Sequence, residues 1–342
     1  MKIARLLILS LILFFVSPRL GFSDSVRLSG WWAYWSVSEG QASLTKNLNL
    51  FDDILIFNYA FDENGNVINN EPDFSKSLND SNVTVLATIV NDVIPTGGGK
   101  PTLKDPGIIH KILSDPALRK QHIQQIINII EQEHFSGIDI DYESLNFNDR
   151  DIFSQFIQEL SSVLKPKGYW LSVTVEEKIK DKKNNGQGAM DCAALSQYAD
   201  EIRIMCYNYS SLVSDPGPIA PPSWLQEIIL FAKSQIPLNK ITIALALHGF
   251  DWSSERNESI TFAKAMERAA TYKAKIRRDK ISATPYFSYE KNNKKHTVWF
   301  EDYKSIYEKL KIIKKQGIHA VALWKLGGED VRIYSILKKF KD

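Results

Sequence analysis

Gly137-Ile138-Asp139-Ile140-Asp141-Tyr142-Glu143 alternates three carboxylates with large apolar side chains. Successive side chains of a β-strand point to opposite faces, so this spacing places the three carboxylates together on one face. Like charges this close repel one another, and burial adds to the cost, so such a strand usually serves chemistry. Crowding also raises the pKa of at least one carboxyl group, as a general acid requires. A solvated acidic edge strand is the alternative, but the run from Phe135 to Tyr142 is too apolar for an exposed edge.

The rest of the chain alternates short β-branched or aromatic runs with longer amphipathic runs, the rhythm of repeated βα units. The predicted strands are Ser29–Tyr34, Ile54–Tyr59, Val83–Ile89, Gly137–Tyr142, Trp170–Val175, Glu201–Tyr207, Ile241–Leu247 and Ala320–Trp324. Helices are predicted at Leu118–Glu133, Ile152–Leu164 and Tyr303–Lys315, among others. Because no linker or repeat divides the chain, we predict one α/β domain, a (β/α)8 TIM barrel over residues 25–342 with catalytic residues at the strand ends.

The segment between the seventh and eighth predicted strands is long for a βα unit. It contains two strand-like runs, Thr284–Tyr289 and His296–Phe300, around the turn-like Lys291–Lys295. We therefore predict a small α+β insertion at about residues 250–300. The lysines there, like those in Lys273–Lys280, are typical of a solvated face, and we assign them no function.

Composition excludes several classes of protein. The 342 residues are 44% hydrophobic and 24% charged, enough for a large core. The net charge of +2 falls near zero without the first segment, so no nucleic-acid partner is predicted. The six histidines are scattered and no CxxC or HExxH motif is present, so neither a metal nor another cofactor is predicted. The two cysteines, Cys192 and Cys206, resemble buried packing thiols, although the sequence does not decide whether they form a disulfide. The sequence does not indicate the oligomeric state of the protein.

Residues 1–24 have the layout of a secretory signal peptide. Lys2 and Arg5 precede the apolar run Leu6–Val16, and the small residues Gly21 and Ser23 follow. The expected location is therefore outside the cell or in the cell envelope. An uncleaved signal anchor is the alternative, and it would be the only membrane contact expected.

At this point the strand motif can be compared with known families. It resembles the D-G-x-D-x-D-x-E signature of glycoside hydrolase family 18, whose members include chitinases and N-acetylglucosaminidases. Ile56–Phe61 followed by Gly65 looks like that family's second strand, Met205–Asn208 its sixth and Trp324 its last-strand tryptophan. Further stretches are similar to the branch of bacterial spore-germination and cortex glycosylases, namely Ser214–Pro218, Pro221–Trp224, Gly249–Trp252 and Leu323–Asp330.

Three positions depart from the family pattern. Ser136 falls where the family has its first acidic residue, which would adjust the charge of the next one. Asn208 replaces the commoner aspartate, and its amide can still hydrogen-bond a substrate. His248 stands where many relatives have tyrosine, and its ring either contacts sugar or fills the barrel mouth.

The resemblance implies a substrate-assisted mechanism, in which the 2-acetamido group of the substrate acts as the nucleophile. Glu143 would protonate the leaving oxygen and later deprotonate water. Asp141 would bind the acetamide N–H, and Tyr207 would donate to the acetamide oxygen with Asn208 beside it. Asp139 would exchange a proton with Asp141, or would satisfy buried polar groups of the barrel.

The resemblance also implies aromatic contacts with sugar. Trp324 would form an apolar floor beneath the distorted sugar, with a core tryptophan as the alternative. Met205, on the same strand face as Tyr207, is interpreted as a packing residue. The aromatic residues Tyr34, Trp35, Trp224 and Trp252 either extend a groove or cap the core.

The leading hypothesis is a secreted retaining glycosidase that cleaves β-linked, N-acetylglucosamine-containing polysaccharides or oligosaccharides, either chitin-like or peptidoglycan. A catalytically silent, glycan-binding lectin on the same fold is the alternative, kept open by Ser136 but disfavoured by the retained Glu143, Asp141 and Tyr207. An unrelated barrel enzyme acting on a non-acetylated sugar is a third reading. A deacetylated substrate separates these cases, because it lacks the internal nucleophile.

Overall fold

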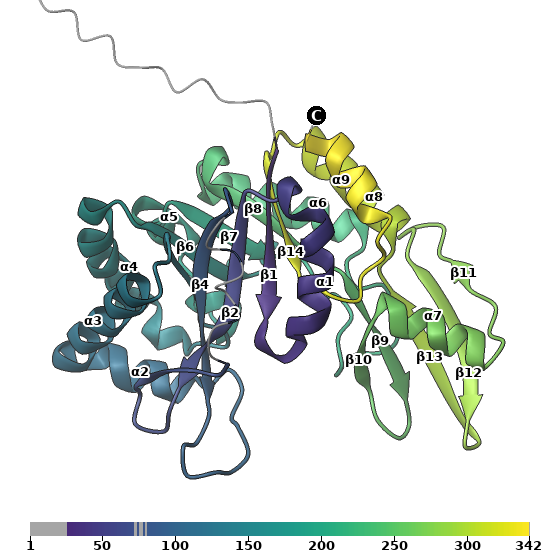
Figure 1. The fold of residues 1–342 in the computed structure, drawn as a ribbon, viewed down its shortest axis with the longest axis horizontal. Coiled ribbons are helices and arrows are strands. Elements are labelled where there is room, and N and C mark those ends of the chain that lie inside the picture. Colours follow the sequence, from purple (N-terminus) through teal and green to yellow (C-terminus); the bar gives the residue numbers. More distant parts are fainter. Residues whose placement is uncertain (1–25, 72–73, 75–77, 79–80, 342) are drawn as a thin grey trace, which may run out of the picture.

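The computed structural model describes residues 26–71, 74, 78 and 81–341, so the predicted signal peptide lies outside the described residues. Eight parallel strands of this part form a closed barrel in the order β1-β14-β8-β7-β6-β5-β4-β2, and pairing of β1 with β2 closes it (Figure 1). The barrel strands are β1 (Arg27–Ala33), β2 (Asp53–Phe61), β4 (Thr84–Val93), β5 (Gly137–Asp141), β6 (Trp170–Glu176), β7 (Glu201–Met205), β8 (Ile241–Ala246) and β14 (Ala320–Trp324). A short strand, β3 (Val67–Asn69), pairs antiparallel with β2. The predicted fold class is confirmed.

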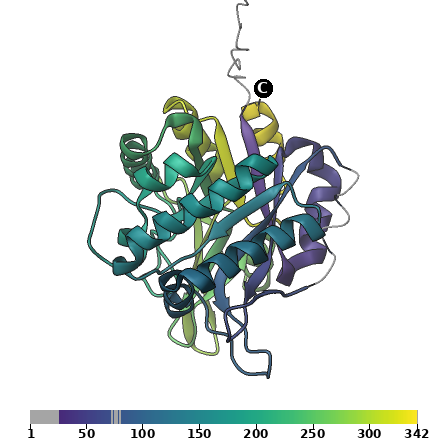
Figure 2. The ribbon, with the colours of Figure 1, turned by 90° about the vertical axis from the view of Figure 1, so that its left-hand side faces the viewer.

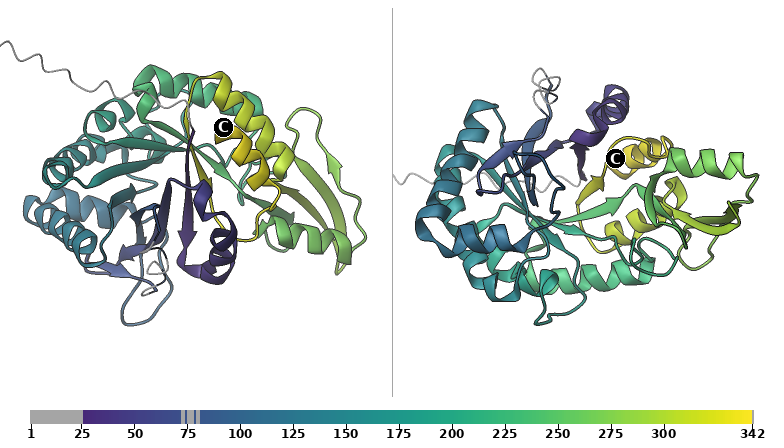
Figure 3. Two further views of the ribbon diagram at one scale, coloured as in Figure 1. Left: turned by 45° about the horizontal axis from the view of Figure 1, so that its top comes forward. Right: turned by 90° about the horizontal axis from the view of Figure 1, so that it is seen from below.

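Helices surround the barrel (Figures 2 and 3). They are α1 (Val37–Asn47), α2 (Pro106–Ser114), α3 (Pro116–Gln132), α4 (Arg150–Leu164), α5 (Cys192–Tyr198), α6 (Pro222–Gln235), α8 (Tyr303–Lys315) and α9 (Ile333–Lys341). Local sequence explains where several of them begin. Asp105 and Asp115 accept N-terminal backbone N–H groups and are each followed by proline, and Asp302 forms a capping box with Ser305. Within the described residues, no helix is both long and apolar enough to cross a membrane.

Each barrel strand divides its side chains between two cores. Outward-facing residues such as Ile138 and Ile140 pack with the helices in the larger core. Inward-facing residues such as Leu55, Phe57 and Met205 form a smaller core inside the barrel. Because the barrel interior is closed to water in its middle, the carboxylates on the inner face of β5 enter a confined space.

The predicted insertion is a five-stranded antiparallel sheet with one helix, which projects to one side of the barrel (Figures 1 and 3). Its elements are β9 (His248–Ser253), β10 (Glu258–Thr261), α7 (Phe262–Thr271), β11 (Arg277–Arg278), β12 (Pro285–Lys291) and β13 (Lys294–Phe300). Asn292 and Asn293 join β12 to β13 with φ of 52° and 59°, the left-handed conformation that a tight hairpin requires and that asparagine tolerates.

Predicted boundaries differ from the structure mainly at the carboxyl ends of strands. The strand expected at Glu201–Tyr207 ends at Met205, and the strand expected at Gly137–Tyr142 ends at Asp141. The interpretation of Cys192 and Cys206 as packing residues is confirmed, since both are buried free thiols.

Candidate active site

Strand β5 places its three carboxylates at increasing height along the barrel. Asp139 and Asp141 point inward, and Glu143 lies two residues beyond the strand end, where Asn91 holds its backbone. The Asn91 side chain accepts the Glu143 N–H at 2.9 Å and donates to the Glu143 carbonyl at 2.8 Å. Ser144 then turns the chain away with a left-handed φ of 57°. The Glu143 carboxylate is thereby fixed at the rim of the barrel.

A cavity of about 740 Å³ opens at this rim. Its lining residues are Trp35, Phe57, Val90, Asn91, Asp92, Leu103, Lys104, Asp141, Glu143, Ser144, Met205, Tyr207, Asn208, Ser211, Leu212, Val213, His248, Phe250 and Trp324. The cavity therefore lies at the carboxyl ends of the strands, the usual place for an active site in this type of barrel.

Asp141 is a buried carboxyl group that lacks an obvious partner. It is 4% exposed, and its Oδ1 finds no hydrogen-bond partner in the described part of the chain. Burial, followed by the charges of Glu143 and Asp139, raises the pKa of Asp141 well above its usual value. Because buried polar atoms are normally hydrogen-bonded, an unpartnered oxygen in a cavity wall indicates a place for a polar group of a ligand.

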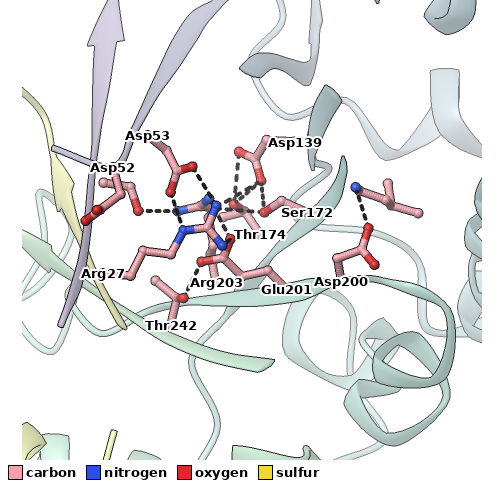
Figure 4. A network of polar contacts seen from close by, with 12 residues as sticks. Arg27, Asp52, Asp53, Asp139, Ser172, Thr174, Asp200, Glu201, Arg203 and Thr242 are labelled. Atoms are coloured by element: carbon pink, nitrogen blue, oxygen red, sulfur yellow. Dashed lines mark hydrogen bonds and ion pairs between the residues drawn. The ribbon is translucent and has the colours of Figure 1, made fainter. Parts of the chain in front are cut away.

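Asp139 lies deeper and is surrounded by donors (Figure 4). It accepts hydrogen bonds from Trp31 Nε1 at 3.3 Å, Thr88 at 3.1 Å, Ser172 at 2.8 Å and Thr174 at 3.0 Å. Burial raises the pKa of Asp139, while the Arg203 guanidinium, at 3.8 Å, and the hydrogen bonds oppose that rise. These contacts support the structural alternative for Asp139, in which it satisfies polar groups inside the barrel.

Tyr207 and Trp324 line the cavity from other strands. Tyr207 follows β7 and is 5% exposed, and burial raises the pKa of its hydroxyl well above the usual value, so it remains a donor at neutral pH. Trp324 ends β14, precedes a cis peptide bond and packs edge-on against Phe57 with ring centroids 4.9 Å apart. Trp324 also lines the cavity.

Asn208 and His248 also line the cavity. Asn208 is exposed and has a left-handed φ of 75°, a conformation that asparagine tolerates better than most residues. His248 begins β9, and burial lowers the pKa of its imidazole to about 4, so it is neutral at pH 7. Its ring centroid lies 6.3 Å from that of Tyr207. All seven predicted site residues therefore converge on this end of the barrel, with Asp139 beneath the cavity.

Comparison with known proteins now identifies the family. The model of the glycosyl hydrolases family 18 matches residues 27–329. The chain belongs to this family. YdhD of Bacillus subtilis (strain 168), named as a sporulation-specific glycosylase, is 31% identical over 281 residues, which cover 80% of this chain and 65% of YdhD. The cortical fragment-lytic enzyme of Bacillus anthracis is 33% identical over 224 residues, which cover 63% of this chain and 52% of that enzyme.

The fold of this chain is also similar to that of a solved structure. The crystal structure of the spore cortex-lytic enzyme SleL from Bacillus cereus aligns with a TM-score of 0.81 at 25% identity, covering 92% of this chain and 74% of that one. The chain thus spans between half and two thirds of the length of the first two relatives. Family 18 proteins generally bind carbohydrates that contain N-acetylglucosamine, and the cavity of this family 18 barrel is the candidate site for one.

The structure distinguishes two of the four aromatic residues whose role the sequence left open. Trp35 lines the cavity and is 51% exposed at its mouth. Trp252 is buried at 4% exposure and donates its indole N–H to the Ser211 carbonyl at 2.9 Å, so it stiffens the loop above the cavity. Met205 is buried as predicted, and its side chain also forms part of the cavity wall.

Ser136 lies at the opposite end of β5 from Asp141 and Glu143. It is exposed at the amino-terminal side of the barrel, beside Arg27 and Trp170 in a separate depression. Its backbone pairs with Val85 and Trp170. Among the described residues, the side chains that hydrogen-bond to Asp139 are Trp31, Thr88, Ser172 and Thr174, and Ser136 is not one of them.

Sequence reasoning missed two residues that contact Glu143. Asn91 follows the predicted third strand, so its polar side chain at a strand end was a usable signal. Lys104 lies in a loop, and its Nζ forms an ion pair with Glu143 Oε2. No periodicity or motif marks Lys104, because the loop has neither strand nor helix spacing.

Proposed function

We propose that this family 18 barrel is a retaining glycosidase that cleaves β-linked, N-acetylglucosamine-containing glycans with the substrate's acetamide as nucleophile. The observation that carries the proposal is the buried, unpartnered oxygen of Asp141 in the cavity wall, directly below Glu143 and with Tyr207 in the same lining. An acetamide N–H meets the need of Asp141 for a partner, and a tyrosine hydroxyl is suited to donate to the acetamide oxygen.

The proposed first step breaks the glycosidic bond. Protonated Glu143 gives its proton to the leaving oxygen while the acetamide oxygen attacks the anomeric carbon, which forms an oxazolinium ion. Positive charge spreads onto the acetamide nitrogen, so its hydrogen bond to Asp141 becomes stronger than in the ground state. In the second step, ionised Glu143 takes a proton from water, and the resulting hydroxide opens the ring with net retention. Trp324 supplies the apolar surface beneath the sugar.

Bacterial cell-wall peptidoglycan is the substrate that we favour over chitin. The support is the similarity to a cortical fragment-lytic enzyme and to a sporulation-specific glycosylase, both from Bacillus. We extend the proposal to export through residues 1–24, since peptidoglycan lies outside the membrane and this segment has the sequence of a secretory signal.

Product analysis by mass spectrometry tests this proposal. The protein and its Glu143→Gln variant would each be incubated with N-acetylglucosamine oligomers, the same oligomers after deacetylation, and purified peptidoglycan. We expect fragments from acetylated glycans with the parent protein alone. Binding without fragments from either protein would support the lectin reading, and cleavage of deacetylated oligomers would exclude the acetamide mechanism.

A further inference from the structure

Lys104 is the one cationic side chain among the described residues that line the cavity, since His248 is neutral at pH 7. Its ammonium contacts the carboxylate of Glu143 rather than a neighbouring loop. No other side-chain partner of that carboxylate is found in the described part of the structure. The lysine therefore acts on the group to which the proposed mechanism assigns the proton transfers.

The loop holds Lys104 in place through its backbone. The Lys104 N–H donates to the Asp92 carboxylate at 2.8 Å, and Lys104 has a left-handed φ of 53°, which is uncommon for a residue other than glycine. Two hydrogen bonds between Val93 and Thr102, at 2.8 and 3.0 Å, close the loop just before Lys104. The side chain is 47% exposed, so it reaches from the solvent side down to Glu143, which is 13% exposed.

The cation is retained over the whole pH range in which a glycosidase works. The charges and the hydrogen bond of Glu143, with further contributions from Asp141 and Glu176, outweigh the opposing effect of burial and raise the pKa of Lys104. Asp92 and Asp141 also line this part of the cavity, so the ammonium is the positive charge among several carboxyl groups.

We propose that Lys104 is a positioning residue that stabilises the ionised form of Glu143, the form produced when Glu143 has protonated the leaving oxygen. This inference rests on the acid–base role proposed above for Glu143. In the transition state, negative charge develops on the carboxylate next to a fixed cation, which makes Glu143 a stronger acid at the moment of transfer. The same contact orients the carboxylate for the second step, in which it takes a proton from water.

This role has a signature that a purely structural role lacks. Without the cation, the ionised carboxylate of Glu143 loses its fixed counter-charge, so Glu143 donates its proton less readily. For Lys104→Met we therefore expect the acidic plateau of kcat/KM to fall about three- to tenfold, and the alkaline limb to move up by about one pH unit. The two pH profiles should approach one another or cross at alkaline pH. Because the ion pair between Lys104 and Glu143 is partly exposed to solvent, we expect its effect on the pH profile to lie at the low end of the usual range.

The experiment compares the parent protein with Lys104→Met, Lys104→Arg and Lys100→Met, the last as a matched control on the exposed part of the same loop. Full pH profiles of kcat/KM on N-acetylglucosamine oligomers give the first readout. Lys104→Arg should restore most of the plateau and the position of the limb, and Lys100→Met should leave both unchanged. A reduced plateau with an unmoved limb, or failure of arginine to rescue, would overturn the proposal.

A second readout does not depend on turnover. Carbon-13 NMR titration of the glutamate carboxyl groups, with Glu143 assigned through Glu143→Gln, follows the protonation of Glu143 directly. In Lys104→Met its titration should move to higher pH, and an unmoved titration would refute the inference even in an active enzyme. An inactive parent in which the titration still moves would contradict the proposed function alone, so the two failures are distinguishable.

Discussion

Replacement of Asp139 by asparagine tests whether this carboxylate anchors the floor of the barrel or exchanges a proton with Asp141. Asparagine keeps the volume but removes the charge and one of the two acceptor oxygens. In the structure, Asp139 Oδ1 accepts from Ser172 and Thr174, and Oδ2 accepts from Trp31, Thr88 and Thr174. All of this lies in a region with almost no exposure to solvent.

Either orientation of the new amide loses contacts. With its nitrogen toward Trp31, it faces an indole N–H that cannot accept. With its nitrogen toward Ser172, it competes with Arg203 Nε, which already donates to that hydroxyl at 2.7 Å. One hydrogen bond to a charged acceptor is worth about 1.5–3 kcal/mol, and loss of a buried counter-charge costs up to about 3–5 kcal/mol. Because Arg203 keeps its ion pair with Glu201 at 2.7 Å, we expect a loss of about 3 kcal/mol.

Urea unfolding at pH 7 measures this difference. Thr88→Val serves as the graded control, because it removes a single donor to Asp139 and should cost about 1 kcal/mol. If Asp139→Asn were as stable as the parent to within about 0.5 kcal/mol and yet lost turnover, Asp139 would be protonated in the native protein, and the proton-exchange reading would replace the structural one.

Three further outcomes are expected. Tyr207→Phe should lower kcat about 100-fold on acetylated oligomers with little change in folding stability, because one donor to the developing charge is lost; a change confined to KM would argue against that role. Trp35→Ala should raise KM about three- to tenfold with kcat nearly unchanged, since its half-exposed ring offers a sugar a stacking surface at the cavity mouth, and titration with oligomers checks this. Burial lowers the pKa of His122 to about 4, so the folded state binds fewer protons than the unfolded chain between about pH 4 and 6.5, and stability falls as the pH drops through that window. His122→Gln should therefore reduce the loss of unfolding free energy between pH 7 and pH 4 by about 3 kcal/mol, measured by urea unfolding, and an unchanged loss would show that His122 titrates normally.

The barrel was predictable because its strands are buried on both sides and read as apolar runs with short polar interruptions. β5 and β14 were predicted to within one residue, and the insertion was placed from the same signals. The predicted end of the sixth barrel strand was less accurate. It was placed at Tyr207, whereas β7 ends at Met205 and the chain turns at Asn208. Helix α1 and helix α2 are short, at 11 and 9 residues, so tertiary packing rather than periodicity determines them.

The seven site residues named from the sequence lie at one end of the barrel, whereas the contact between Lys104 and Glu143 was missed. Asp139, Asp141 and Glu143 are related by the two-residue period of a strand, which the sequence displays directly. The pairing of Lys104 with Glu143 depends on a loop closed by Val93 and Thr102, and no local rule predicts where such a loop brings its side chains. The buried position of Arg203 inside the barrel was not predicted for a different reason. An arginine at such a position can be recognised only when its buried partners are known.

The position of these charges along the barrel explains why the unpartnered carboxyl group is Asp141. Below it, Arg203 is paired with Glu201, and Arg27 forms hydrogen bonds to Asp53, so the carboxylates of the floor are matched by cations (Figure 4). Above it, Lys104 matches Glu143 at the rim. Asp141 lies between these two compensated layers, and burial together with the adjacent carboxylates makes its ionisation costly. A ligand that offers one N–H at this height supplies the partner that the barrel leaves out, and the acetamide of an N-acetylated sugar is such a ligand.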